Sequence, residues 1–201
     1  MNYAICVSGA ASGKTVKTSF ELAERLGTEI AKKGHMVTTG ATVGLPFYAA
    51  KAAKEAGGMS IGFSPASSLR EHVAKYRLPI GVFDFINFTG MHYVGRDVHL
   101  VQSSDAIITV GGRFGSLHEF TTALESRMPC GVLTGSGGTA DIIDELMERL
   151  EPVNKDMVIF DDNPERLVQT IIKMLDVEYK EINTKALSAQ WFLETEHHHQ
   201  G

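Results

Sequence analysis

Short apolar runs alternate with longer amphipathic stretches along most of this 201-residue chain. Each run has the length of a buried strand, and each stretch is long enough for a helix that leads back to the next strand. This alternation predicts the α/β class: a Rossmann-like doubly wound parallel sheet of about seven strands with helices on both faces. We expect strands at residues 3–8, 36–39, 59–63, 84–88, 106–110, 131–134 and 157–160, and helices at 16–33, 45–56, 91–103, 116–127, 139–150 and 164–175.

The alternation stops near residue 178, so we expect a single domain over residues 1–177 and a C-terminal tail over 178–201. In that tail Trp191, Phe192 and Leu193 are apolar enough to need cover from the domain or from a second subunit. They favour a homodimer or a higher homo-oligomer. Residues 197–201 include three histidines, to which we assign no metal site.

Charge and cysteine content narrow the classes of partner. The formal net charge is −5 and no dense Lys/Arg block occurs, so we expect no nucleic acid and no membrane among the partners. Cys6 and Cys130 each lie in an apolar strand-like run, which predicts reduced core thiols and not a disulfide framework. Since no export signal or transmembrane-length run is present either, we expect a cytoplasmic protein.

Four glycine-rich loops follow expected strands, at residues 8–13, 40–44, 111–116 and 135–139. In an open parallel sheet ligands bind outside the carboxyl ends of the strands, so these loops converge where a ligand would sit. Tight turns alone also require glycine, but the coincidence of four such loops favours a nucleotide-binding domain. The expected nucleotide contacts are Ser8, Gly9, Gly40, Gly44, Met91, Thr134 and Gly135.

The loop at 111–116 is the most informative of the four, because it joins an apolar strand to a helix through three glycines. Glycine lets the backbone approach a ligand closely, and the N–H groups of the following helix attract an anion. The expected phosphate contacts are Gly111, Gly112, Arg113, Gly115 and Ser116, with the carboxylate of Glu119 beside them. Ser116-x-x-Glu119 is also a capping box that satisfies free backbone N–H groups, and both roles can hold.

Two familiar nucleotide motifs are almost present and are rejected. Gly13-Lys14-Thr15 ends like the phosphate loop of nucleotide triphosphatases, but Ser8 stands where its opening glycine belongs. A dehydrogenase needs an acid at the end of the second strand to hold the ribose, whereas that strand ends Thr38-Thr39-Gly40. Neither activity is therefore expected.

Arg96 is the remaining candidate. We expect Met91, Val94, Val98 and Val101 to form the apolar stripe of its helix, which leaves Arg96 on another face with His92 and His99. There it could reach a ligand, or it could be an ordinary solvated cation. The two histidines do not form an i,i+4 pair, so we expect no metal site.

Several of these residues, in chain order, resemble a known family: Thr89-Gly90-Met91, Arg96, Asp105-Ala106 and Val110-Gly111-Gly112-x-x-Gly115-Ser116-x-x-Glu119. The pattern is similar to the Lonely Guy superfamily, also labelled lysine decarboxylase-like, in its bacterial and archaeal branch with a Val-Gly-Gly motif. The resemblance implies a Rossmann-like dimer that binds a nucleoside monophosphate and hydrolyses its N-glycosidic bond. It implies catalytic roles for Arg96 and Glu119 and a phosphate loop at Gly111, Gly112, Gly115 and Ser116, with no cofactor.

This chemistry is consistent with the residue types. Breaking the bond from C1′ to nitrogen develops positive charge on the ribose, which a carboxylate such as Glu119 can stabilise, or it can activate water. Compared with the family enzymes, Val110 replaces proline, Ser116 replaces threonine, and Asp97 stands where lysine is common. Our leading hypothesis is a nucleoside 5′-monophosphate phosphoribohydrolase-like enzyme. The alternative is a non-catalytic nucleotide sensor or molybdenum-cofactor carrier, and in either case we expect residues 64–88 to line the pocket for the base.

Overall fold

The computed structural model describes residues 2–186 of the chain, and the side chains of residues 2–180. Its strands are β1 (Ala4–Gly9), β2 (Met36–Thr39), β3 (Ser60–Ser64), β4 (Phe85–Phe88), β5 (Ala106–Val110), β6 (Cys130–Leu133) and β7 (Val158–Asp161). Its helices are α1 (Lys14–Lys32), α2 (Leu45–Glu55), α3 (Leu69–Ala74), α4 (His92–Gln102), α5 (Phe114–Glu125), α6 (Ile143–Leu150) and α7 (Pro164–Ala186), with 3-10 turns η1 (Gly138–Asp141) and η2 (Lys155–Met157).

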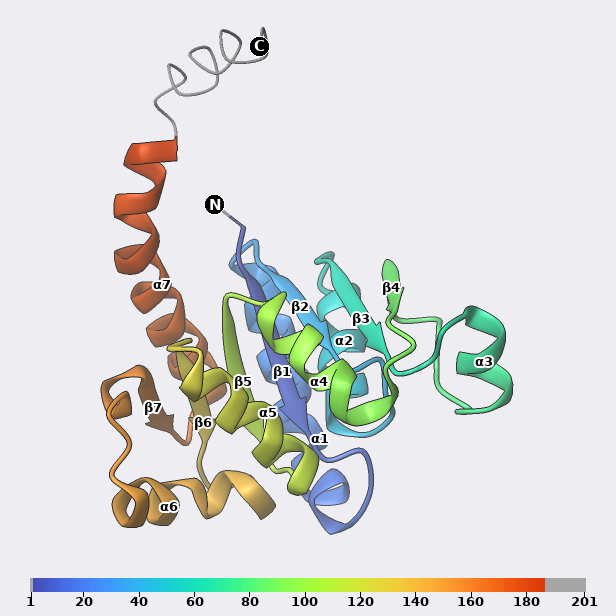
Figure 1. Cartoon of the computed structure of the whole chain (residues 1–201), viewed down its shortest axis with the longest axis horizontal. Helices are drawn as coiled ribbons and strands as arrows, with labels where there is room; N and C mark the ends of the chain where they lie inside the picture. Colours follow the sequence, from blue (N-terminus) through green and yellow to red (C-terminus); the bar gives the residue numbers. More distant parts are fainter. Residues whose placement is uncertain (1, 187–201) are drawn as a thin grey trace, which may run out of the picture.

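The seven strands form one parallel sheet in the order β4-β3-β2-β1-β5-β6-β7 (Figure 1). The prediction of a doubly wound α/β fold is confirmed. The chain moves outward from β1 in one direction through β2, and in the other direction through β5. The carboxyl ends of β1 and β5 therefore border the point where the strand order reverses, which is where such sheets bind ligands.

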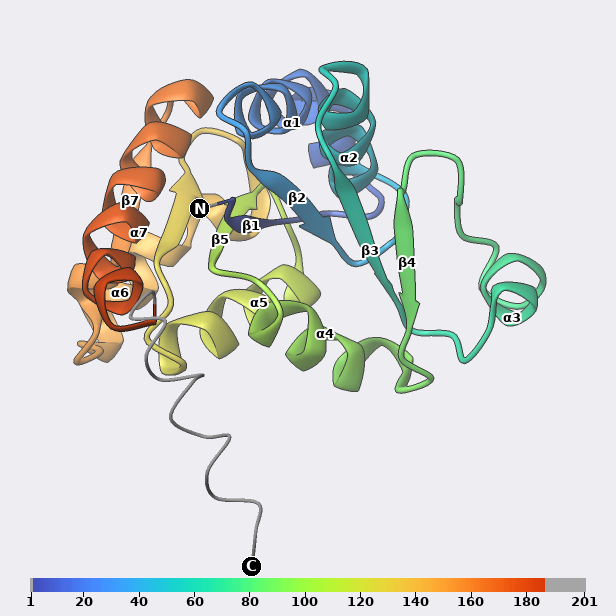
Figure 2. The ribbon, with the colours of Figure 1, turned by 90° about the horizontal axis from the view of Figure 1, so that it is seen from above.

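Helices cover both faces of the sheet (Figure 2). Alternate residues of β1 point to opposite faces: Ile5 and Val7 pack with apolar side chains of α1, α2 and α7, whereas Cys6 packs with those of α4 and α5. Near-continuous apolar strands such as β5, buried along its whole length, are what a sheet covered on both faces requires. Cys6 and Cys130 are both free and buried, as the sequence predicts.

Several element boundaries differ from the prediction. The helix expected at 116 begins at Phe114, and the one expected at 139 is divided into η1 and α6. Residues 64–82, for which no strand or helix was predicted, contain α3, which Ser68 caps by accepting a hydrogen bond from the Glu71 N–H. Ser68-x-x-Glu71 is a capping-box sequence, so the signal for this short helix was present.

The last helix, α7, continues past the expected end at 175 to Ala186. The expectations for Trp191, Phe192 and Leu193 and for residues 197–201 lie outside the described residues. Among residues 2–186, no helix combines the length and the hydropathy that a membrane crossing needs.

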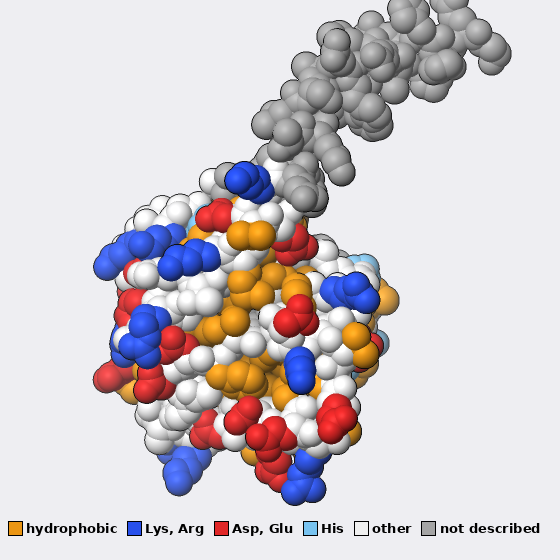
Figure 3. All heavy atoms as spheres, turned by 90° about the vertical axis from the view of Figure 1, so that its left-hand side faces the viewer, with side chains coloured by type: hydrophobic (Ala, Val, Ile, Leu, Met, Phe, Trp, Pro, Cys, Tyr) orange, Lys and Arg blue, Asp and Glu red, His pale blue; other side chains and the backbone are white. Residues whose placement is uncertain are grey.

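Apolar side chains gather on the face that α6, α7 and the edge strand β7 contribute (Figure 3). Leu150 is 74% exposed at the end of α6, Val153 is 90% exposed in the loop after it, and Val177 is 75% exposed on α7. A surface of this kind can be covered by another subunit. The homo-oligomer stays a prediction.

Candidate functional site

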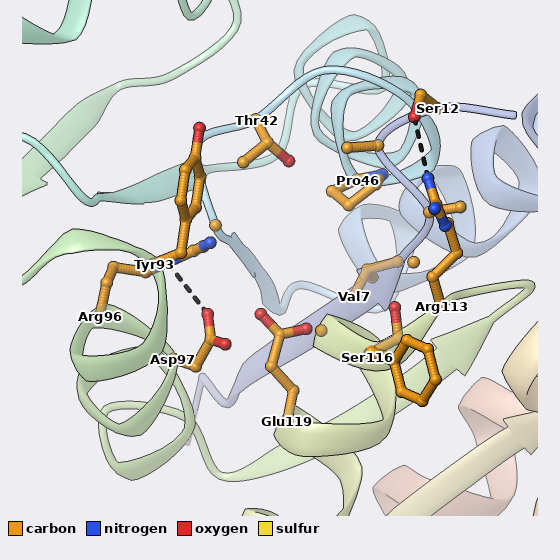
Figure 4. Close-up of a pocket in the computed structure, with 16 residues that line it drawn as sticks. Val7, Ser12, Thr42, Pro46, Tyr93, Arg96, Asp97, Arg113, Ser116 and Glu119 are labelled. Carbon is orange, nitrogen blue, oxygen red and sulfur yellow. Dashed lines mark hydrogen bonds and ion pairs between the residues drawn. The ribbon is translucent and has the colours of Figure 1, made fainter. Parts of the chain in front are cut away.

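A pocket of about 340 Å³ opens at the carboxyl ends of β1, β2 and β5, close to the switch point (Figure 4). Among the sequence-predicted residues, the structure brings together Gly9, Gly40, Arg96, Arg113, Gly115, Ser116 and Glu119 in its lining. The remaining lining residues are Val7, Ala10, Ala11, Ser12, Thr42, Pro46, Tyr93, Asp97 and Phe114.

Glu119 lies in the second turn of α5 and is only 8% exposed. Its carboxyl group accepts a hydrogen bond from the hydroxyl of Ser8, which β1 places beneath the pocket. The capping-box alternative is wrong: α5 begins at Phe114, Arg113 occupies the N-cap position without a side-chain cap, and Glu119 is directed into the pocket. The N-cap lies three residues earlier than the sequence motif implies, at Arg113 and not at Ser116, so Glu119 lies beyond the turn that a capping box serves.

The surroundings of Glu119 change its acidity. Burial raises the pKa of Glu119 to about 7, the charge of Arg96 opposes that rise, and the charge of Asp97 adds to it. A carboxyl group in a cleft whose pKa is shifted by burial and by a specific charge partner is a candidate for a functional group.

Arg96 is buried, with 4% of its surface exposed, and this rules out the solvated-cation alternative. The buried face of α4 consists of Arg96, Asp97, Leu100 and Val101, whereas Val94 is 69% exposed. The predicted apolar stripe is therefore wrong apart from Val101. The helix turns its charged residues inward because they border a polar pocket and pair with each other.

The guanidinium group of Arg96 has spare hydrogen-bonding capacity. Its Nε lies 3.2 Å from Asp97 Oδ1, an ion pair that lacks hydrogen-bond geometry. Among the described residues, neither Nε nor Nη1 has a hydrogen-bond partner. A buried donor without a partner is costly, so an arginine in this state is suited to an oxygen-rich ligand.

Gly40 makes the position of Arg96 possible. A Cβ at residue 40 would lie 1.5 Å from Arg96 Nη1 and 2.6 Å from Cζ. Gly40 was predicted as a nucleotide contact, and it does line the pocket. The structure adds a second requirement for glycine there, which is room for the guanidinium group.

The N-terminus of α5 forms the other end of the pocket. Arg113, Gly115 and Ser116 line it, and Arg113 Nη1 lies 3.5 Å from Ser12 Oγ (Figure 4). The first turn of a helix carries N–H groups without partners inside the helix, which makes it a suitable place for an anion. Phe114 is 88% exposed at the edge of this region.

Gly111 and Gly112 do not line the pocket. The N–H of Gly111 donates to Ser136 Oγ, and the carbonyl groups of Gly111 and Gly112 accept from the N–H groups of Ala140 and Thr139. Their φ angles of 58° and 108° are in the range that favours glycine. The two glycines thus join the loop after β5 to the loop after β6 and hold the start of α5 in place.

Five other predicted contacts lie outside the pocket lining, and one of them, Ser8, donates to Glu119. Gly44 packs against the β1–α1 loop, where a Cβ would be 2.3 Å from the carbonyl oxygen of Ala10. Met91 is 48% exposed and occupies the N-cap position of α4. Thr134 and Gly135 donate backbone hydrogen bonds to Asp161 and Asp141.

No residue of 64–88 is among those that line this cavity, so the expectation that these residues line a base pocket stays a prediction. Sequence reasoning missed Tyr93 and Asp97, which α4 brings to the pocket with Arg96. The available signal was position in the sequence: Tyr93 lies three residues before Arg96 on the same helix, and Asp97 follows Arg96 directly. Among the described residues, no group of three or more histidine, cysteine or acidic side chains is placed to hold a metal ion.

Several known proteins are similar to this chain in sequence or in fold. An uncharacterized protein of Archaeoglobus fulgidus is 33% identical over 115 residues, which cover 57% of this chain and 70% of that protein. The molybdenum cofactor binding protein of Rippkaea orientalis superposes with a TM-score of 0.72 and 27% identity, over 87% of this chain and 98% of the other. The molybdenum cofactor carrier protein of Chlamydomonas reinhardtii gives a TM-score of 0.70 with 24% identity, over 87% and 99% of the two chains.

A more distant likeness is to a protein that binds DNA. DNA processing protein A of Helicobacter pylori, described with a single-stranded DNA binding mode, matches with a TM-score of 0.59 and 19% identity over 85% of this chain and 80% of the other. This likeness shows a shared fold. The resemblance to the Lonely Guy proteins is confirmed at the level of the SLOG superfamily, which includes the folds of the Lonely Guy-like proteins and of DNA processing protein A. The SLOG cluster4 family model matches residues 2–168, and the chain belongs to that family.

Proposed function

We propose that this protein binds a nucleoside 5′-monophosphate and hydrolyses its N-glycosidic bond to a free base and ribose 5-monophosphate. One observation carries the proposal: a buried carboxyl group with a pKa near 7, that of Glu119, lies in the same pocket as the buried, unsatisfied Arg96 guanidinium. A general base acts best when its pKa is near the working pH.

The pocket offers different chemistry along its length. The N-terminus of α5, with Arg113 and Ser116, provides donors for a phosphate group. Arg96 provides further donors at the opposite side, and Glu119 lies between these cationic ends (Figure 4). A ligand with its phosphate at α5 would therefore place its ribose near Glu119.

In this position the ionised Glu119 would accept a proton from water as the water oxygen bonds to C1′ and the bond from C1′ to nitrogen breaks, and the departing base would then take up that proton. The carboxylate would also stabilise the positive charge that develops on the ribose ring. Ser8 holds the carboxyl group in place through its hydrogen bond. None of these steps requires a cofactor.

The test is to incubate the purified protein with AMP, GMP, CMP, UMP, IMP and an N6-substituted AMP, and to measure free base and ribose 5-phosphate by chromatography. We expect release from at least one nucleotide, and its loss in Glu119→Gln and in Arg96→Ala with melting temperatures that show both variants folded. Unchanged turnover in both variants would contradict the assignment.

A second candidate is a carrier of a phosphorylated pterin such as the molybdenum cofactor. It is favoured by the 27% identity to the Rippkaea orientalis protein, which extends over nearly the whole of that chain. In this case the pocket would bind its ligand without releasing a product. A rise in melting temperature with the molybdenum cofactor, together with no hydrolysis of any nucleotide, would favour the carrier.

A further inference from the structure

Two buried carboxyl groups meet in the pocket. Asp97 on α4 is 5% exposed and Glu119 on α5 is 8% exposed. Figure 4 shows the two groups directed toward each other, and the negative charge of Asp97 adds to the rise that burial gives to the pKa of Glu119. Two ionised carboxylates at close range repel each other, so this arrangement favours a pair that holds one proton.

Asp97 has partners on both of its oxygens. Oδ1 lies 3.2 Å from Arg96 Nε, and Oδ2 lies 3.1 Å from His118 Nδ1. Asp97 therefore contacts a cation from its own helix, a titratable ring from α5 and the acid of the site. The family enzymes considered above commonly have lysine at this position, which could not make the same set of contacts.

These contacts favour a particular distribution of charge. Arg96 and His118 both contact Asp97, whereas Glu119 accepts a hydrogen bond from Ser8 and has its pKa lowered by Arg96 as well. Glu119 is the member of the pair whose pKa is raised, so a proton held by the pair is favoured on Glu119. The groups that face Glu119 are Cys6 and Ser8 from β1, and Arg96 and Asp97 from α4.

We propose that Asp97 is a positioning residue: its carboxylate holds the Arg96 guanidinium group and the His118 ring, and its negative charge keeps a proton on Glu119. The inference rests on the proposed function for its kinetic consequence. Asp97 sets the pH above which Glu119 becomes the ionised base. Removing the negative charge at residue 97 makes Glu119 easier to ionise, because a like charge is lost and Arg96 is left with one carboxylate to pair with.

The experiment compares the wild type with Asp97→Asn. Carboxyl carbons of ¹³C-labelled glutamate are followed by NMR across the pH range, and Glu119→Gln identifies the Glu119 signal. The titration midpoint of Glu119 is expected to fall by about one pH unit in Asp97→Asn, the scale of a single neighbouring charge. The acid limb of nucleotide hydrolysis is expected to move down by the same amount.

Asp144→Asn is the matched control, since Asp144 is an exposed carboxylate on α6 outside the pocket lining. It should leave the Glu119 midpoint unchanged. Asp97→Ser is a second variant that removes the charge if the asparagine variant does not fold. A Glu119 midpoint that stays within 0.3 pH units of wild type in a folded Asp97 variant overturns the proposal.

The NMR midpoint needs no turnover, so the two proposals can fail separately. If no nucleotide is hydrolysed but the midpoint falls, the hydrolase assignment fails and the role of Asp97 stands. If hydrolysis occurs and its pH profile is the same in Asp97→Asn, the role of Asp97 fails and the hydrolase assignment stands.

Discussion

Replacing Gly40 by alanine should displace Arg96 and weaken ligand binding without unfolding the protein. The new Cβ would lie 1.5 Å from Arg96 Nη1 and 2.6 Å from Cζ, so the guanidinium group cannot keep its position. Gly40 is not among the glycines with a positive φ, and its backbone conformation is open to alanine. The arginine side chain must therefore be the part that moves.

The expected loss follows from the donors that move. A hydrogen bond to a charged group contributes about 1.5–3 kcal/mol, which corresponds to a loss in affinity of about tenfold to 150-fold. Arg96 Nε and Nη1 have no hydrogen-bond partner within the described residues, so displacing them breaks no such bond in the free protein. The substitution therefore destabilises the ligand-bound state more than it destabilises the free protein.

Isothermal titration with ribose 5-phosphate, the part common to all nucleoside monophosphates, measures the effect. Gly81→Ala is the control, because a Cβ there has no heavy atom within 4 Å and the residue is outside the pocket lining. In an Arg96→Ala background, Gly40→Ala should cause no further loss, since both changes remove the same contact. If Gly40→Ala binds ribose 5-phosphate within twofold of wild type, Arg96 does not hold the ligand and the reasoning is refuted.

Three further predictions concern stability and reactivity. Gly27→Ala should lower the free energy of unfolding by about 1–3 kcal/mol in a denaturant titration, because its Cβ would lie 2.0 Å from the carbonyl oxygen of Ala49 where α1 and α2 pack; unchanged stability would contradict this close packing. Cys6 and Cys130 should react with a thiol reagent only after unfolding, since burial raises the pKa of both thiols, and brings that of Cys130 to about 12; rapid labelling of the native protein would be the contrary result. Glu119 has a pKa of about 7 in the folded protein against an ordinary value of 4.5, so wild-type stability should fall as the pH rises from about 4.5 to 7, by a total on the order of 3 kcal/mol. Glu119→Gln should remove that dependence, giving a higher melting temperature than wild type at about pH 8 and a similar one at about pH 4.5, and equal melting curves at both pH values would exclude a raised pKa.

The sheet could be predicted from the sequence because its strands are short, apolar and separated by amphipathic stretches. The strands β2 and β5 coincide with the predicted ranges, β4 begins one residue later, and the other four are displaced by one residue at both ends. Local pattern was sufficient here, since buried parallel strands carry the signal within their own residues. The division of the expected helix at 139–150 into η1 and α6 was not predicted, because contacts of Thr139 and Ala140 with the loop after β5 determine it.

The candidate site shows the limit of local pattern more clearly. Arg96 and Glu119 were identified, but the inward face of α4 was assigned to apolar residues. The prediction assigned the buried face of the helix to its most apolar residues. Charged residues are buried only when other groups pair with them, and the sequence of one helix does not show those groups. The neighbours of the Arg96–Asp97 pair lie on α5, where Glu119 interacts with the charge of Arg96 and His118 contacts Asp97, and both are distant in sequence from the pair. The orientation of α4 is therefore decided by contacts between helices.

The glycine motif and the acidic pair contribute different information about function. Gly111 and Gly112 are required by positive φ angles and by bonds to the loop after β6, and these requirements are the same for a hydrolase and for a carrier. Hydrolysis needs in addition a carboxylate that can release its proton in the working pH range. Whether Glu119 does so depends on the opposing effects of Arg96, which lowers its pKa, and Asp97, which raises it. The two candidate functions therefore make different demands on residue 97. A negative charge there keeps Glu119 protonated to a higher pH, which raises the pH at which hydrolysis begins. For a carrier, the same proton makes Glu119 a hydrogen-bond donor to the ligand.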